Sequence, residues 1–221
     1  MTAWLHQWRR EGHAAQARAE AAVTLSVEQG FPFWVAWGTI LRGGALAEQG
    51  QREAGIAQLR QGIAASRATG AEQAQPWFLA LLAEAYGEGG QAEEGLSVVA
   101  EALAMVDKNG ERYWEAELYR LKGTLTLQSQ VQGPKSQAQE AEECFHKAIE
   151  IARQQQARSL ELRASTSLAR LWQHQGKPAE AHQLLSEIYH WFTEGFDTKD
   201  LQEAKALLEV LSQLFTCKIF R

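Results

Sequence analysis

The feature that most constrains the fold of this chain is a period of 40 residues in the positions of its glycines and tryptophans. The positions that repeat at this interval are Gly30, Gly70 and Gly110; Gly50 and Gly90; Gly55 and Gly95; and Trp37 and Trp77. We call each set of equivalent positions a column. Self-similarity at a fixed period of this length is typical of an array of stacked structural repeats.

The period is interrupted once, by the polar segment QSQVQGPKS at residues 128–136. This segment contains Gly133 and Pro134, two residue types that favour loops. Adding six residues restores the register beyond it, so that Gly95 corresponds to Ala141. The sequence therefore predicts a six-residue loop insertion inside one repeat.

Each repeat contains two helix-length segments separated by a glycine turn. Good helix formers dominate these segments, and the chain has only four prolines. The turn glycines suit the left-handed end of a helix, and Pro32 and Pro178 suit a first helical position. Pro76 falls inside a predicted helix and is expected to shorten or kink it. The predicted first helices cover 32–48, 72–88, 112–128 and 158–174, and the predicted second helices cover 52–69, 92–108, 138–155 and 178–194.

Two columns hold small residues where the two helices of a pair are expected to meet. Small side chains let two helix axes approach closely, and a larger residue four positions later fills the space beside the contact. A helix pair of this kind cannot bury its apolar face alone, so consecutive pairs are expected to stack. The small residues are Gly43, Ala83, Gly123 and Ala169 on the first helices, and Gly55, Gly95, Ala141 and Ala181 on the second helices.

The two ends of the chain depart from this plan. Residues 11–30 fit a second helix, but the segment before them, TAWLHQWRR, is only about half as long as a first helix. Near the other end, Asp197 or Thr198 is expected to be the N-cap of a capping helix. The apolar stripe of that helix consists of Leu201, Ala204, Leu208 and Leu211.

The order of residues within a repeat resembles that of the tetratricopeptide repeat (TPR) family. A large residue, a small residue, an aromatic residue, a turn glycine and two alanines recur in that family's order, and the best copies are residues 76–109 and 162–195. The resemblance implies an all-α fold, a right-handed α-solenoid of antiparallel helix pairs, here with a 40-residue period and a C-terminal capping helix. The period is longer than the family's usual one, which implies extended helices.

The chain is predicted to form a single TPR-like superhelical domain over residues 1–221. Its predicted parts are a partial N-terminal repeat at 1–30, repeats at 31–70, 71–110, 111–156 and 157–195, and the capping helix at 196–215.

Residues 111–127 and 191–208 also look like part of larger bacterial proteins. They resemble the C-terminal helical region of regulators that combine a class III adenylate cyclase-like domain, a STAND/AAA-type ATPase module and TPR repeats. This resemblance implies, as an alternative, that the chain is a regulatory or sensor region of such a signalling protein. The sequence lacks GxxxxGK[ST], so the nucleotide chemistry of those proteins is not expected in this chain.

The composition and charge of the chain limit the kinds of partner and the cellular compartment that we expect. The formal net charge is −5 with acids and bases interspersed, so no basic stripe is present to bind nucleic acid. No apolar run is long enough to cross a bilayer, and the first residues do not form a signal peptide. Only two cysteines are present, Cys144 and Cys217. We therefore expect a cytoplasmic protein that binds neither nucleic acid nor a membrane.

Candidate catalytic and metal-binding residues are few. His182 and His190 lie eight positions apart on one predicted helix, about 12 Å along its axis, too far to share a metal ion. Cys144 and His146 match no zinc-binding spacing, and Cys144 is expected to be a buried or half-buried thiol. The sequence thus predicts no enzyme activity, no metal site and no cofactor.

The first helices line the concave surface in the family that the chain resembles, and this implies a groove. Its side chains mix aromatic, acidic and basic groups, which suit a peptide held by aromatic anchors and charge pairs. Alternatively, the tryptophans wedge between neighbouring helix pairs. The predicted function is a non-catalytic scaffold for a protein or peptide partner, with homodimerisation through the exposed half-repeat, at Trp4, Leu5 and Trp8, as a further hypothesis. The predicted groove residues are Trp37, Trp77, Glu84, Glu117, Arg120, Thr124, Arg163, Arg170 and Gln173.

Overall fold

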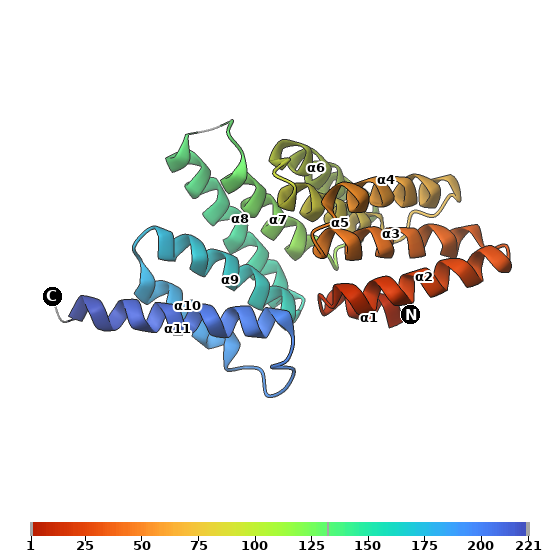
Figure 1. Cartoon of the computed structure of the whole chain (residues 1–221). Helices are drawn as coiled ribbons and strands as arrows, with labels where there is room; N and C mark the ends of the chain where they lie inside the picture. The colour runs from red at the N-terminus through yellow and green to blue at the C-terminus, as the bar shows by residue number, and fades with distance from the viewer. Residues whose placement is uncertain (1, 132, 220–221) are drawn as a thin grey trace. The chain divides into compact units, whose positions relative to one another are not determined.

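The structure, a computed structural model, describes residues 2–131 and 133–219, without the side chains of 215–219. All regular secondary structure in these residues is α-helical, as predicted, and no helix among them has the length and apolarity to span a bilayer. The helices are α1 (Thr2–Trp8), α2 (Gly12–Glu28), α3 (Pro32–Glu48), α4 (Arg52–Ala68), α5 (Gln75–Glu88), α6 (Ala92–Asn109), α7 (Glu115–Gln128), α8 (Pro134–Gln154), α9 (Arg158–His174), α10 (Pro178–Tyr189) and α11 (Lys199–Ile219) (Figure 1).

The helix bounds follow the 40-residue period closely, and the departures have local causes. Helices α3 and α9 begin and end at the predicted residues. Helix α5 begins at Gln75 instead of residue 72, after Ala74 in a left-handed conformation, and Pro76 lies in its first turn, where a residue without an amide hydrogen is tolerated. Helix α7 also begins three residues late, at Glu115. Since α7 has no proline, the later start is common to both repeats, and Pro76 is accommodated in the first turn of α5 without a kink being required.

The loop insertion is smaller than predicted, because part of it is helical. Helix α8 begins at Pro134 instead of residue 138, so that five residues separate it from the end of α7 at Gln128. Pro134 presets a helical φ, and the side-chain amide of Gln137 donates to the Ser129 carbonyl, which ties the added turn to the end of α7. Helix α10 is shorter than predicted and ends at Tyr189, after which the His190 ring binds the Ser186 carbonyl at 2.8 Å.

A left-handed backbone conformation recurs in the turns with the 40-residue period. Gly70 and Gly110 have φ angles of 78° and 74°, in the left-handed region that glycine enters without steric cost. Gln156 occupies the next position of the same column and has a φ of 55°. Arg10 stands in the column of Gly50 and has a φ of 58°. The turn geometry is therefore retained even where the glycine is not.

The chain divides into two compact units, unit 1 at residues 1–114 and unit 2 at residues 115–221. In unit 1, α3 pairs with α4, α5 pairs with α6, and α2 packs on α3. In unit 2, α7 pairs with α8, α9 pairs with α10, and α11 packs on both α10 and α9. The single domain over 1–221 stays a prediction.

The small-residue columns lie where paired helices touch. A Cβ atom added to Gly43 of α3 would stand 2.8 Å from the Leu59 backbone nitrogen, and one added to Gly55 of α4 would stand 2.7 Å from the Gly43 carbonyl oxygen. Both distances are shorter than van der Waals contact, so the two helices meet backbone to backbone. This is the close approach that the sequence predicts.

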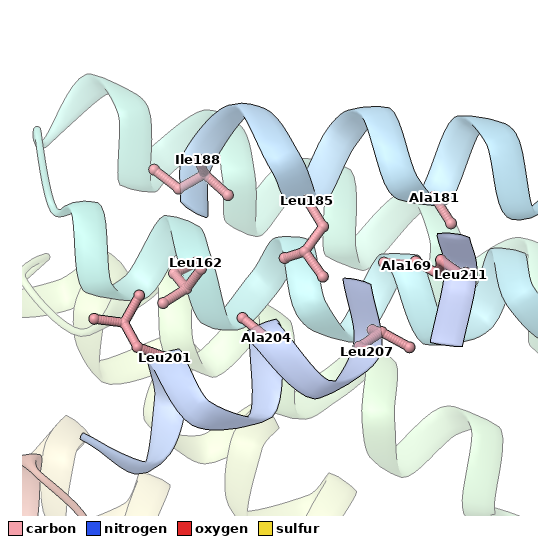
Figure 2. Close-up of a cluster of buried hydrophobic side chains, with 9 residues drawn as sticks. All are labelled: Leu162, Ala169, Ala181, Leu185, Ile188, Leu201, Ala204, Leu207 and Leu211. Atoms are coloured by element: carbon pink, nitrogen blue, oxygen red, sulfur yellow. The ribbon is translucent and has the colours of Figure 1, made fainter. Parts of the chain in front are cut away.

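Helix α11 covers the end of unit 2 as a capping helix. Its apolar side chains pack on α9 and α10 around Leu162, Leu185 and Ile188 (Figure 2). The predicted stripe needs one correction, because Leu207, 8% exposed, lies in this core, whereas Leu208 packs only at its edge. The core residues are Leu162, Ala169, Ala181, Leu185, Ile188, Leu201, Ala204, Leu207 and Leu211.

Candidate interaction surfaces

The predicted groove residues lie on first helices, as expected, but the structure divides them between the two units. Trp37, Trp77 and Glu84 belong to α3 and α5 in unit 1. The others belong to α7 and α9 in unit 2: Glu117, Arg120, Thr124, Arg163, Arg170 and Gln173. One column contains Trp37 and Trp77 in unit 1 and Glu117 and Arg163 in unit 2, so it is aromatic in the first unit and ionic in the second. Each unit is therefore described by itself.

In unit 1, the groove column is filled by tryptophans that pack on one another. Trp77 is 1% exposed, with Trp4 stacked on it at a centroid distance of 5.1 Å and Trp114 stacked at 6.0 Å. Trp37 is 9% exposed and meets Phe78 edge-on at 5.0 Å. We call the connected rings the aromatic cluster: Trp4, Trp8, Phe33, Trp34, Trp37, Trp77, Phe78, Tyr113 and Trp114.

This burial favours the wedge interpretation for most of the tryptophans. Trp77, Trp37 and Trp114 fill space between helices and offer almost no surface to a bound segment. Trp34 differs, because 53% of it is exposed. Each buried tryptophan removes about 150–250 Å² from water, so rings on neighbouring helices that reach one another gain more by mutual contact than by solvation.

The cluster is held by ring contact more than by hydrogen bonds. The indole N–H groups of Trp4 and Trp37 are buried and have no acceptor among the described residues. At the rim, Trp8 and Tyr113 are each 43% exposed. Burial raises the pKa of the Tyr113 hydroxyl, and the carboxylate of Glu111 raises that pKa further. The Tyr113 hydroxyl at this rim therefore keeps its proton at neutral pH.

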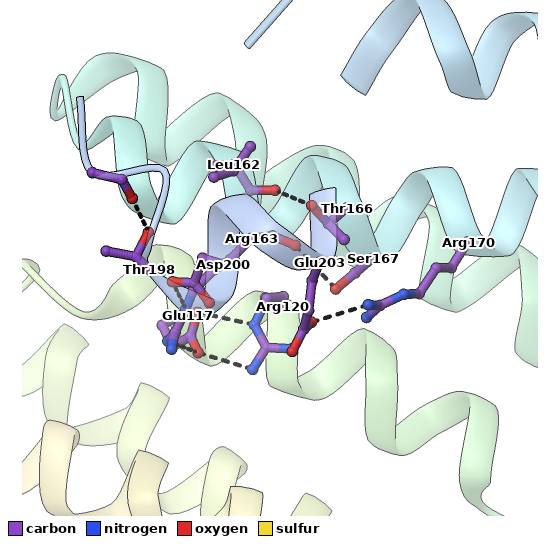
Figure 3. Close-up of polar contacts among 11 residues, drawn as sticks. Glu117, Arg120, Leu162, Arg163, Thr166, Ser167, Arg170, Thr198, Asp200 and Glu203 are labelled. Carbon is purple, nitrogen blue, oxygen red and sulfur yellow. Dashed lines mark hydrogen bonds and ion pairs between the residues drawn. The ribbon is translucent and has the colours of Figure 1, made fainter. Parts of the chain in front are cut away.

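In unit 2, the same column forms a chain of ion pairs across three helices. Glu117 of α7 is 3% exposed, and its Oε1 accepts from Arg120 Nη2 at 2.8 Å and from Arg163 Nη1 at 2.9 Å (Figure 3). Arg163 of α9 also donates from Nε to Oδ2 of Asp200 at 2.9 Å. A buried carboxylate requires such compensation, and removing one member leaves an unpaired buried charge.

Asp200 and Glu203 of α11 complete this arrangement, and sequence reasoning did not assign them a role. Glu203 pairs with Arg170 of α9 at 3.0 Å, near the surface, where the arginine side chain is 49% exposed. The sequence did contain a related pattern. Asp200 and Glu203 follow Arg163 and Arg170, their partners, by roughly the length of one repeat. The sequence does not show that the Arg163 side chain is largely buried, so these two acids could not be distinguished from ordinary surface charges.

The remaining predicted residues lie toward the C-terminal ends of the first helices, where the side chains are more exposed. Thr124 and Gln173 are partly exposed, and Leu127 is 38% exposed. Thr124 and Arg170 are equivalent positions on the neighbouring helices α7 and α9, as are Leu127 and Gln173, so the four side chains lie at corresponding levels. We call these four residues the unit-2 face. Glu84 of α5, in unit 1, is also partly exposed.

The described cysteine and histidine side chains can be compared with the sequence-based expectations. Cys144 is a buried free thiol, as expected, and desolvation raises its pKa. His182 lies on α10, whereas His190 follows the end of that helix. No group of three potential metal-ligating side chains occurs among the described residues. The Cys217 side chain lies outside the described residues.

No known family model matches this chain. A curated relative is an uncharacterised protein of Rhizobium meliloti (strain 1021), 31% identical over 132 residues. That match covers 60% of this chain but only 12% of the relative, so the chain spans a small part of the relative's length.

Two solved structures are similar to this chain. Both contain nearly identical TPR-like repeats from a Podosopora anserina protein designated a kinesin light chain, one of them as a point variant. Their TM-scores are 0.56 and 0.57 at 19% and 20% identity. The matches cover 85% and 80% of this chain, and 89% and 85% of those chains. The likeness shows that the fold is TPR-like.

Proposed function

We propose that this chain is a non-catalytic protein-interaction module that binds a protein or peptide segment on the first helices of its repeats. The TPR-like fold supports this, because repeat folds of this kind present extended surfaces made of successive equivalent side chains. The observation that carries the proposal is the unit-2 face, where Thr124, Leu127, Arg170 and Gln173 stay accessible about two turns along the same helices from the buried ion pairs of Glu117 and Arg163.

The chemistry of the unit-2 face favours an acidic segment. Arg170 is exposed and pairs with Glu203 near the surface, an interaction of about 0–1 kcal/mol. A partner carboxylate can replace Glu203 at little cost, while an apolar partner side chain covers Leu127. Contact of the other predicted groove residues with the peptide stays a prediction; the ion pairs of Glu117, Arg120 and Arg163 link α7 to α9 and so hold the two helices of the face together.

The test is selection of binding peptides from a displayed library, followed by calorimetric titration of the best one. We expect the double variant Arg170→Glu/Gln173→Ala to weaken binding at least tenfold, which corresponds to about 1.4 kcal/mol. The matched control is Lys147→Glu, a charge reversal at an exposed lysine of the second helix α8. Equal affinity for both variants would remove the unit-2 face from consideration. Binding should also weaken with salt, since the charge pair is exposed.

A second candidate is the regulatory or sensor region of a multidomain adenylate cyclase or STAND/AAA-type ATPase signalling protein. The relative from Rhizobium meliloti favours it, because the matched segment makes up only 12% of that longer protein. Reading the gene around this sequence tests it directly. Nucleotide-binding domains in the same reading frame or its upstream neighbour support this function, and their absence from both contradicts it.

A further inference from the structure

Helix α11 continues the register of the first helices, in addition to capping unit 2. Adding 40 to the bounds of α9, 158–174, gives 198–214, and α11 begins at Lys199. Two columns that are buried on α5, α7 and α9 reach Ala204 and Leu211 in the core of α11 (Figure 2). One column contains Phe78, Leu118, Ala164 and Ala204, and the other contains Ala85, Leu125, Leu171 and Leu211.

The contacts of α11 are also those of a first helix. Helix α11 packs on α9 and α10, as α9 packs on α7 and α8. Glu203 of α11 stands in the column of Glu117 and Arg163. Two ion pairs join α9 to α11, from Arg163 to Asp200 at 2.9 Å and from Arg170 to Glu203 at 3.0 Å (Figure 3). Helices α7, α9 and α11 are therefore three successive first helices of unit 2.

The two columns of the unit-2 face each gain a third side chain on α11. Val210 is 44% exposed, and Gln213 is exposed as well. The same columns stay accessible on α7 and α9, although further helices follow and pack on both of those helices. The column, and not the position of α11 in the described chain, therefore accounts for the exposure of Val210. One column contains Thr124, Arg170 and Val210, and the other contains Leu127, Gln173 and Gln213.

The chemistry of these three helices selects one kind of partner. Arg170 supplies a positive charge on the middle helix, and exposed apolar side chains flank it, Leu127 on α7 and Val210 on α11. Packed helices lie about 8–10 Å apart. An extended chain advances about 3.3 Å per residue and passes from one helix to the next in about three residues. A helical segment advances about 1.5 Å per residue and needs about six residues for the same distance.

We propose that the unit-2 face extends onto α11 and binds an extended acidic segment, with an apolar residue about three positions to each side of its acid. The acid pairs with Arg170, and the two apolar residues cover Leu127 and Val210. Gln173 and Gln213 carry amide groups that can bind the backbone of such a segment, which an extended conformation leaves without internal hydrogen bonds. This inference rests on the proposed function and adds the conformation of the partner and the spacing of its contacts.

The first test is selection from a displayed library of peptides randomised on both sides of one fixed glutamate, with the full chain as the target. We expect apolar residues to be enriched about three positions from the glutamate on both sides. Fluorescence anisotropy with the best peptide then measures affinity. Val210→Gln should weaken binding about fivefold, because an apolar contact is lost. The matched control is Val27→Gln, the same substitution at a valine of α2 that is 62% exposed, which should leave affinity unchanged.

Peptide variants test whether Val210 itself makes the contact. Replacing either enriched apolar residue by serine should weaken binding to the wild-type chain, and one of the two replacements should have little further effect on binding to Val210→Gln. Additive losses for both replacements would overturn the inference. Enrichment about six positions from the glutamate would also overturn it, because that spacing indicates a helical partner.

The two proposals fail in different ways. Peptides that Arg170→Glu/Gln173→Ala weakens but Val210→Gln does not would overturn this inference and leave the proposed function intact. Binding of no peptide, or binding that Arg170→Glu/Gln173→Ala does not weaken, would overturn both. Circular dichroism verifies that Val210→Gln folds, which is expected because the side chain is exposed.

Discussion

The contact between Gly43 and Gly55 gives the sharpest test of how the helix pairs are built. Gly43→Ala places a methyl group 2.8 Å from the Leu59 backbone nitrogen and 2.9 Å from the Gly55 carbonyl oxygen. Neither atom can move without shifting α4. Overpacking of this kind costs about 1–3 kcal/mol, and replacing a helix-interior glycine by alanine returns about 1 kcal/mol of helix propensity. We expect a net destabilisation of about 1–2 kcal/mol.

The assay is urea denaturation followed by far-ultraviolet circular dichroism. Ala65→Gly, on the exposed side of α4, is the control that measures the propensity effect alone. The double variant Gly43→Ala/Gly55→Ala should be destabilised by less than the sum of the single variants, because the first methyl group already separates the helices. A Gly43→Ala chain that is more stable than wild type by about 1 kcal/mol would refute the close approach, since only the propensity effect would then remain.

Three further outcomes follow from the structure. Gln156→Gly should stabilise the chain by about 1 kcal/mol in the same assay, because it relieves a left-handed residue at φ 55°; a destabilisation would show that the Gln156 side chain matters more. Glu117→Ala should cost about 3 kcal/mol, because it removes the buried carboxylate that Arg120 and Arg163 share while Arg163 keeps its pair with Asp200, and a neutral result would contradict the buried ion pairs. The pKa values of Cys144 and Tyr113 are raised by burial, so the unfolded chain loses these protons first and stability should fall as the pH rises past 9.0; Cys144→Ala/Tyr113→Phe should flatten that decline.

The arrangement of helices could be predicted because it depends on local signals. Glycine at φ near 75°, proline at a first helical position and small residues at helix contacts each restrict a few neighbouring residues, and all recur with the period. Where a local signal was misjudged, as at Pro134, the error was a few residues at one helix end.

The placement of the groove residues could not be predicted in the same way. Whether Trp77 or Glu117 faces a partner or a neighbouring helix depends on how far the side chains of successive first helices reach, which no single repeat determines. Trp77 is enclosed by rings from α1 and from residue 114, and Arg163 is paired by an acid on α11. These contacting residues belong to other helices than the pair that carries Trp77 or Arg163. The sequence of a single repeat therefore does not reveal them.

Residue-resolved amide hydrogen exchange on the full chain tests the central claim most directly. That claim is that each second helix is protected by the first helix that covers it. The C-terminal halves of α2 and α6 are equivalent, yet Ala22 is exposed and Ala102 is 0% exposed. We expect residues 20–28 to exchange much faster than residues 100–108. Equal protection of the two segments in the free chain would contradict the account.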